Sequence, residues 1–292
     1  MKPESRNRAV RPPAVAGMFY EEDPGRLESE IGDYLKQADP QPVSGSVIAL
    51  ISPHAGYAFS GQAAAYGYKL LDPKHINRVL VIAPSHRMRF RGVSIPPVEA
   101  YRTPLGLISL DRKSCDELLK ANEWFYSIDQ AHDQEHSLEV QLPFLQVALA
   151  DFQLVPMVVG QLKNRDSTHI AKSLLAMLRE KDLVVVSSDF THQGPRFGYM
   201  PYNKDIKKRV RDLDMGAIDR ILQMNSEDFR GYVSDTGATI CGNQPISILL
   251  DMLPNTAKGT LLTYYTSGDI LGEETETVSY ASIVFENASG WA

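Results

Sequence analysis

Short uninterrupted apolar runs alternate with longer segments of helical periodicity along most of the chain. The runs at residues 46–52, 78–83 and 183–186 lack the polar alternation of a half-exposed strand, which indicates strands buried on both faces. Apolar residues spaced three and four apart predict helices between such strands. The expected helices cover residues 24–37, 62–71, 111–121, a segment ending near 149, 166–180, 204–224, 228–233 and 245–253.

Further apolar runs predict strands at residues 154–159, 260–266 and 277–285. Strands alternating with helices predict an α/β fold with a mostly parallel central sheet and helices on both faces. Residues 88–110 carry several prolines and short β-like pieces, which favours an insertion or edge region over a core unit. No repeat or linker interrupts the pattern, so we predict a flexible tail over residues 1–12 and a single domain over residues 13–292.

Composition narrows the class of protein. The chain is 43% hydrophobic and 23% charged, as expected of a soluble globular protein with a sizeable core. A formal net charge of -6 gives no support for a nucleic-acid or anionic membrane partner. No apolar run approaches the roughly 20 residues that span a bilayer, and the basic N-terminus lacks the hydrophobic segment of a signal peptide. With only two cysteines and no disulfide framework, we predict a cytoplasmic protein.

Three of the seven histidines follow the ends of predicted buried strands. His54 and His86 stand in Ser-Pro-His and Pro-Ser-His contexts, and His192 comes after the strand at residues 183–186. Because parallel strands end at one edge of their sheet, where ligands bind in open α/β folds, we expect these imidazoles to converge. Any one of them alone is more often a satisfied polar residue. His136, which opens a predicted helix, is a fourth candidate.

Two imidazoles and a third, anionic group are the minimum for a catalytic metal with open coordination positions. Asp189, Glu139 and Cys241 are candidates for the third ligand. Cys241 precedes a predicted helix start, where the helix dipole favours a thiolate, although most free cysteines are small buried hydrophobes. Asp189 can also form an acid–imidazole unit with His192; the alternative is a loop in which Asp189 only caps a turn.

A metal-independent hydrolase is a weaker hypothesis. Ser188 or Cys241 would be its nucleophile, with Asp189 and His192 nearby in the sequence. An aspartate three residues before a histidine is too local for the usual relay, and no Gly-x-Ser-x-Gly elbow or oxyanion loop is evident. The sequence also lacks dinucleotide-binding and Walker glycine motifs.

Seven motifs together resemble those of the Memo family, also called protein B of the AmmeMemoRadiSam system. They occur in family order from near residue 13 to about residue 285, which is nearly the whole chain. Each motif alone is unspecific, but the combination is specific. The motifs are Ala14-Val-Ala-Gly-Met-Phe-Tyr20, Pro53-His-Ala-Gly-Tyr57, Pro84-Ser-His86, Tyr101-Arg-Thr-Pro104, Glu135-His-Ser-Leu-Glu139, Ser187-Ser-Asp-Phe-Thr-His192 and Thr239-Ile-Cys-Gly242.

The resemblance implies a fold similar to that of class III extradiol dioxygenases, which use non-haem Fe(II). On the matching positions it implies metal ligands at His54, His86 and Cys241. The dioxygenases place a carboxylate where Cys241 stands, and the softer thiolate changes metal preference and redox behaviour, so dioxygenase activity does not follow from the fold. The further catalytic candidates, acting as acid/base groups or orienting the ligands, are His192, Asp189, His136 and Glu139.

Two functional hypotheses follow. The first is a metal-binding, oxidoreductase-like protein that holds Fe(II), or copper, and leaves a coordination position for O₂ or a small phenolic or peptide ligand. The second is a non-catalytic module that binds a peptide or protein segment in the same crevice, with Phe19, Tyr20 and Tyr57 as aromatic walls. The resemblance also implies a functional association with a radical-SAM protein.

Overall fold

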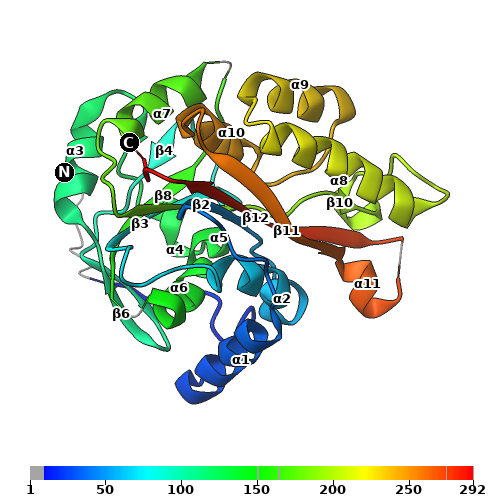
Figure 1. Ribbon diagram of the computed structural model, residues 1–292, viewed down its shortest axis with the longest axis horizontal. Coiled ribbons are helices and arrows are strands. Elements are labelled where there is room, and N and C mark those ends of the chain that lie inside the picture. The colour runs from blue at the N-terminus through cyan, green and yellow to red at the C-terminus, as the bar shows by residue number, and fades with distance from the viewer. Residues whose placement is uncertain (1–9, 150, 164, 274, 292) are drawn as a thin grey trace, which may run out of the picture.

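Four parallel strands form the centre of a nine-stranded sheet, and helices cover both of its faces (Figure 1). In this computed structural model, which describes residues 10–149, 151–163, 165–273 and 275–291, every residue of the central strands β3 (Arg78–Pro84) and β9 (Asp182–Ser187) is buried. Burial on both faces explains why the sequence shows no polar alternation there. The other two central strands are β2 (Ser46–Ser52) and β8 (Gln153–Val159).

In space these four strands lie in the order β2, β9, β3, β8, and antiparallel strands flank them. On one side β12 (Thr277–Asn287) pairs with β2 and also with β11 (Lys258–Thr266) and β10 (His192–Gln193). On the other side β4 (Val93–Ser94) runs antiparallel to β8 and parallel to β7 (Phe125–Tyr126). The α/β prediction is confirmed, but the sheet is mixed and only its centre is parallel.

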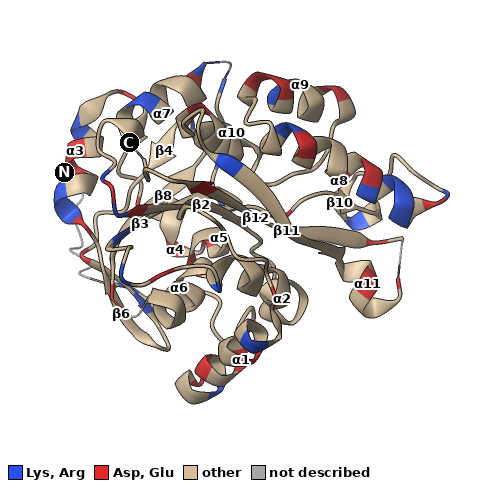
Figure 2. Ribbon diagram, viewed as in Figure 1, with Lys and Arg blue, Asp and Glu red and all other residues tan. Residues whose placement is uncertain are grey.

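The helices form two layers (Figure 1). One face of the sheet carries α1 (Pro24–Gln37), α2 (Tyr57–Tyr68), α4 (Gln130–Asp133), α5 (His136–Glu139) and α6 (Gln141–Leu149). The other carries α3 (Arg112–Ala121), α7 (Asp166–Leu175), α8 (Ile206–Leu222), α9 (Ser226–Thr236) and α10 (Asn243–Met252). A short α11 (Ser267–Leu271) lies beyond the end of β11. Figure 2 shows that charged residues gather on the outer helices and loops and are sparse on the sheet.

Helix α2 begins earlier than predicted and lies close to α1. It begins at Tyr57, five residues before the predicted start, and it packs against α1. A Cβ atom at Gly61 would lie 2.6 Å from a ring carbon of Tyr34 in α1, so only glycine permits this approach of the two helices. The predicted helices at residues 166–180 and 228–233 are observed as α7, which ends at Leu175, and the longer α9.

A small second sheet joins the start of the described chain to residues 88–110. It contains β1 (Val10–Arg11), β5 (Ala100–Thr103) and β6 (Gly106–Ser109). In the main sheet, β4 lies next to the edge strand β7, so the placement of residues 88–110 agrees with the predicted edge region. Arg11, which the prediction assigned to the tail over residues 1–12, is in strand β1 and only 3% exposed; residues 1–9 of that predicted tail lie outside the described part.

No helix in the described ranges combines the length and the apolar character needed to cross a bilayer.

A buried ion-pair network fixes the amino ends of the central strands. Arg78, the first residue of β3, donates from Nε to Asp182 of β9 at 2.9 Å and also from Nη2 to the other oxygen of that carboxylate. Its Nη1 donates to Asp111, the N-cap of α3, at 3.0 Å. These side chains are at most 8% exposed, so the network links two strands and a helix where water does not compete.

Replacing Arg78 with leucine should destabilise the protein by about 3–5 kcal/mol, because two carboxylates would stay buried without their counter-ion. Denaturant-induced unfolding measures this change. Arg179→Leu is the matched control: its 55% exposed side chain lies 3.6 Å from Asp111, and its loss should cost under about 1 kcal/mol. Equal effects of the two substitutions would contradict the role assigned to Arg78.

Candidate metal centre

Three histidines meet where the parallel strands end. Ser52 of β2 lies beside Ser187 of β9, and β3 ends on the other side of β9. His54 and His86 follow β2 and β3, and their ring centroids are 5.2 Å apart. His136, the first residue of α5, lies 5.5 Å from the former ring and 4.8 Å from the latter. One nitrogen from each imidazole lies within 4.8 Å of the others, so this histidine cluster can hold a metal ion.

The hydrogen bonds of His54 fix its tautomer. Its Nδ1 lies 2.8 Å from Oγ of Ser187. That hydroxyl donates its own proton to the carbonyl of Ser137 at 2.6 Å and accepts the side-chain amide of Gln141 at 2.9 Å. The hydroxyl therefore has no proton left for His54, so Nδ1 carries the hydrogen and Nε2 keeps its lone pair. Burial lowers the pKa of His54 well below its ordinary value, so the ring is neutral and ready to bind a cation.

Glu135 orients His86 in the same way. Its carboxylate accepts Nδ1 of His86 at 2.9 Å and the backbone N–H of His86 at 2.6 Å. Although burial opposes ionisation, the bonds to His86 lower the pKa of Glu135 to about 2, so the carboxylate is an acceptor at neutral pH. Nδ1 of His86 is then a donor, and Nε2 is left for a metal.

His136 has a less constrained ring. Its Nδ1 is buried and has no hydrogen-bond partner among the described residues; the nearest carboxylate oxygen, from Glu135, is 3.4 Å away. Burial, reinforced by the charge of His86, lowers the pKa of His136 to about 4. The ring is therefore neutral at pH 7. The sequence predicted a catalytic role for His136, and the structure places it within the histidine cluster itself.

Cys241 lies beside this cluster, just before α10. Its Sγ is 3.2 Å from Nε2 of His54 and accepts the backbone N–H of Asp189 at 3.2 Å. Burial raises the pKa of the thiol well above its ordinary value, and the carboxyl of Asp189 adds to the effect. Without a metal the sulfur therefore keeps its proton, contrary to the thiolate expected at a helix start. A metal binding to Cys241 would have to displace that proton.

Asp189 and His192 flank the cluster but do not form the predicted acid–imidazole unit. Oδ1 of Asp189 accepts the backbone N–H of His54 at 2.8 Å, and burial raises the pKa of this carboxyl. Nδ1 of His192 lies 2.9 Å from the carbonyl of Phe190, which can only accept, so Nδ1 carries the proton. In the neutral ring, Nε2 of His192 is therefore the nitrogen with the free lone pair, which is the one that a general base uses.

Glu139 is not brought to the cluster. Its carboxylate is completely buried and accepts hydrogen bonds from the guanidinium of Arg11, the backbone N–H groups of Ala14 and Val15, and the hydroxyl of Tyr20 at 2.5 Å. These donors occupy the lone pairs that a metal or a proton would need. Glu139 therefore anchors residues 11–20 beneath the site.

Of the three predicted aromatic walls, one faces a cavity. Phe19 packs against His136, with ring centroids 4.8 Å apart, and both line a cavity of about 800 Å³. Tyr20 and Tyr57 are 4% and 2% exposed, and their hydroxyls are bonded to Glu139 and to the carbonyl of Val140. The other lining residues that the sequence analysis did not select include Phe59, Arg196, Phe197, Leu271, Glu273, Glu276 and Tyr280.

Ser188 is not arranged as a nucleophile. Its hydroxyl is fully buried, donates to the carbonyl of Asp189 at 2.8 Å and accepts the backbone N–H of Gly242 at 3.0 Å. A serine nucleophile needs a base that removes its proton, and no hydrogen bond in the described chain joins Ser188 to a histidine. The hydrolase hypothesis is therefore unsupported for this residue.

Comparison with known proteins identifies the family. The profile of the Memo-like proteins matches residues 11–284. A memo-1 homologue of Caenorhabditis elegans is 33% identical over 288 residues, which cover 94% of this chain and 81% of that protein. A MEMO1 family protein of Thermoplasma volcanium is 34% identical over 277 residues, covering 94% and 98%. The chain belongs to the Memo family. The crystal structure of an uncharacterised protein from Escherichia coli K12 aligns with a TM-score of 0.49 and 14% identity, over 82% of this chain and 99% of that one.

Two residues important to the site of this Memo protein were missed by the sequence analysis. Glu135 and Ser187 do not join the histidine cluster, but they fix the proton positions of His86 and His54. The signal for Glu135 was its place in the Glu-His-Ser-Leu-Glu motif, directly before His136. The signals for Ser187 were its position at the end of a buried strand and its place as the first residue of the Ser187-Ser-Asp-Phe-Thr-His192 motif.

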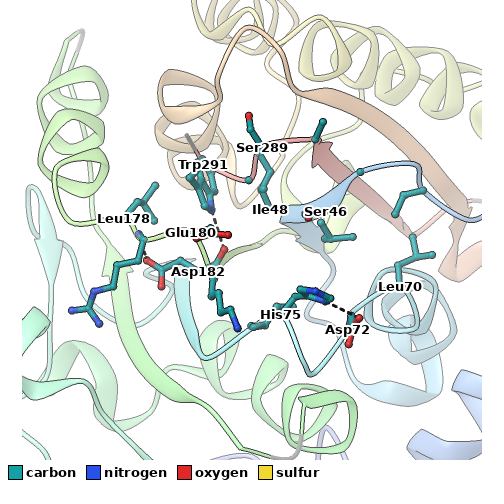
Figure 3. A pocket seen from close by; sticks show the side chains of 18 of the residues that line it. Ser46, Ile48, Leu70, Asp72, His75, Leu178, Glu180, Asp182, Ser289 and Trp291 are labelled. Atoms are coloured by element: carbon teal, nitrogen blue, oxygen red, sulfur yellow. Dashed lines mark hydrogen bonds and ion pairs between the residues drawn. The ribbon is translucent and has the colours of Figure 1, made fainter.

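A larger cavity of this Memo protein, about 910 Å³, lies at the opposite edge of the sheet (Figure 3). It is bordered by the first residues of β2 and β9 and by Trp291, whose Nε1 donates to the carbonyl of Asp182. His75 and Asp72 form a 2.8 Å pair there, but their side chains are 68% and 52% exposed. Because ligands of open α/β sheets bind at the carboxyl ends of strands, we assign the functional site to the histidine cluster.

Glu135→Gln should lower the affinity of the site for Fe(II) about 10- to 100-fold, because the neutral amide no longer fixes His86 with its lone pair toward the metal. Anaerobic competition with a chromophoric chelator measures the affinity. Glu117→Gln, an exposed change on α3, is the control and should leave it unchanged. An unaltered affinity in Glu135→Gln would contradict the orienting role.

His132 should make the protein sensitive to acid. Its Nδ1 contacts the hydroxyl of Tyr101, and burial, followed by the charge of Arg11, lowers its pKa from 6.5 to about 3. Between these values the unfolded chain binds a proton that the native protein does not. The free energy of unfolding therefore falls as pH falls through this window, by up to about 1.4 kcal/mol per pH unit for this group.

Unfolding of the metal-free protein across this pH range tests the effect. His132→Gln should show a slope smaller by one proton than the unsubstituted chain. His75→Gln changes an exposed histidine and should keep the original slope. Parallel slopes for all three proteins would contradict the assignment.

Proposed function

We propose that this Memo protein binds a redox-active metal ion, iron or copper, at the histidine cluster and serves in oxidoreductase-like chemistry or in metal handling. The supporting observation is the fixed protonation of two ligands: Ser187 and Glu135 hold the Nδ1 protons of His54 and His86. Both Nε2 lone pairs are thereby available where the rings approach each other. Such a metal, when bound, supplies Lewis-acid and electron-transfer chemistry at its open position.

Two residues compete for the third position. His136 contributes a nitrogen within 4.8 Å of the other two, whereas Cys241 contributes a sulfur 3.2 Å from Nε2 of His54. A third imidazole suits Fe(II), Zn²⁺ and copper alike, and a thiolate favours softer ions such as Cu(I). We retain His54, His86 and Cys241 as the proposed ligand set and treat His136 as its alternative.

The remaining polar residues would act on the ligand in the cavity. His192, whose Nδ1 is bonded to the carbonyl of Phe190, lines the cavity with Asp189, so it is our proposed general base. Phe19 covers the ring of His136 and limits the access of water to that side of the cluster. The carboxyl of Asp189, with a raised pKa, holds the backbone N–H of His54 and so positions that loop.

A second candidate function is a binding module without turnover. The cavity of about 800 Å³ is lined by Phe19, Phe59, Phe197 and Tyr280, and Leu271 on its wall is 62% exposed. Met18, next to Phe19, is 72% exposed. Exposed apolar side chains around an aromatic cavity favour a peptide or protein segment. A cytoplasmic location and an association with a radical-SAM protein remain predictions of the sequence analysis.

The metal content of anaerobically purified, untagged protein tests the first proposal. We expect near-stoichiometric iron or copper by elemental analysis, and its loss in His54→Ala, because that ring is central to either ligand set. Loss in Cys241→Ser but not in His136→Ala would select the thiolate set; the reverse result would select three imidazoles. His75→Ala, far from the cluster, is the control.

Absence of metal, even after Fe(II) and Cu(I) are offered anaerobically, would contradict the metal proposal and favour the binding module. Circular dichroism and thermal unfolding of each variant distinguish loss of metal from loss of fold. Turnover of a small phenolic compound by the loaded protein would exclude a purely binding role.

A further inference from the structure

The histidine cluster separates two cavities. The cavity of about 800 Å³ described above touches His136, Asp189 and His192. A second cavity, of about 430 Å³, touches His86 and Cys241, and the two share no lining residue. A ligand can therefore approach the cluster from either side. We call the second one the arginine cavity; its lining comprises Pro84, Ser85, His86, Arg87, Met88, Arg89, Val159, Gly160, Gln161, Cys241, Asn243 and Gln244.

The two cavities differ in charge. The larger one contains three carboxylates, from Asp189, Glu273 and Glu276, against one arginine. Among the residues that the structure describes, those lining the arginine cavity include Arg87 and Arg89 and none that is acidic. The positive charge of this cavity contrasts with the net charge of the whole chain, which is -6. The guanidinium groups of Arg87 and Arg89 therefore attract anions into this cavity.

Neither guanidinium is neutralised within the part of the chain that the structure describes. No ion pair or hydrogen bond there involves the side chain of Arg87 or Arg89. Arg91, two residues further on, differs: it forms two bonds of 3.0 Å to the carboxylate of Asp166. The loop thus carries one arginine with a structural partner and two whose donors remain available for a planar, bidentate contact with an oxyanion.

The loop that carries these arginines is held in place before any ligand arrives. The backbone N–H of Ser85 donates to Val159, and that of Gln161 donates to Phe90, so both ends are tied to the end of β8. The Ser85 hydroxyl closes the loop internally by donating to the carbonyl of Met88 at 2.7 Å. A Cβ atom at Gly160 would lie 2.2 Å from the carbonyl oxygen of Phe90, so the loop and the strand end are in direct contact. This fixed backbone reduces the entropy that a ligand would have to overcome.

The opposite wall adds neutral donors. The first turn of α10 supplies Asn243 and Gln244, contains no acidic residue, and has no side-chain cap. Gln161 contributes a further amide. These groups complement the arginines without competing for them, as a carboxylate would.

We propose that the arginine cavity is a binding site for the anionic group, a phosphate or a carboxylate, of the ligand that this Memo protein acts on. Arg87 and Arg89 would hold its oxygens, and the rest of the molecule would extend past His86 toward the histidine cluster. The second half of this statement rests on the proposed metal function; binding of the anion itself does not.

Titration of the metal-free, full-length protein with inorganic phosphate, and separately with acetate, tests the first half. At low ionic strength we expect saturable binding by calorimetry, and amide NMR shifts confined to residues 85–89 and 242–244. The double substitution Arg87→Gln/Arg89→Gln should weaken phosphate binding at least about tenfold, since two charged hydrogen-bonding groups are lost. Added salt should weaken it in the unsubstituted protein.

Arg26→Gln/Arg102→Gln is the matched control, because it removes two exposed arginines elsewhere and should leave the affinity within about twofold. Binding of both anions supports a general oxyanion site, and binding of phosphate alone supports a phosphorylated ligand. Absence of saturable binding of either anion, or equal loss in the two double variants, would overturn the proposal.

His54→Ala separates this proposal from the metal function. If the His54→Ala protein loses its metal and still binds phosphate, both proposals stand. If neither the unsubstituted protein nor the variant binds metal, but phosphate still binds at Arg87 and Arg89, only the proposed metal function fails. Arg87→Gln/Arg89→Gln should keep its metal. Loss of metal together with phosphate in that variant would show that the arginines support the cluster and would overturn their role as an anion site.

Discussion

The register of the central parallel strands is the constraint on which the candidate metal centre depends. β9 lies between β2 and β3, and its last residue, Ser187, lies beside Ser52 and bonds the ring of His54. Because β3 and β9 are buried along their whole length, a slip of one residue would move core side chains into the polar edge. The ion pairs of Arg78 hold the same strands together at their amino ends. The amino ends of these strands thus fix their alignment, and their carboxyl ends carry the side chains of the candidate metal centre.

Proton positions at the cluster follow from the surrounding hydrogen bonds. His54 and His86 are equivalent in the sequence, each two residues beyond a strand, yet one is oriented by a serine and the other by a carboxylate. The neutral partner adds no charge, whereas Glu135 places a negative charge next to His86 and near His136. The negative charge of Glu135 therefore lies on one side of the cluster, and the thiol of Cys241, whose proton a metal ion would have to displace, lies on the other.

The sequence was sufficient for the central strands, most helices and the convergence of His54 and His86, because these depend on local patterns and on the common direction of parallel strands. It was insufficient where distant segments decide the outcome. Glu139 looked catalytic within its motif, but its partner Arg11 lies 128 positions away in a segment expected to be a tail. Tyr20 was predicted to line a ligand cavity, but it is buried and its hydroxyl donates to the distant Glu139. The cavities were beyond prediction, since they depend on how loops from several elements fit together.

The insertion of β9 between β2 and β3 also governs the order in which the site can form during protein synthesis. His54 and His86 emerge early from the ribosome, but the strands that carry them cannot take their final places until residue 187 has been made. Cys241 comes later still and must reach Nε2 of His54, 187 positions earlier in the chain. The histidine cluster therefore cannot be completed before β9 has been made, so a metal ion that binds there would do so after the central strands have assembled.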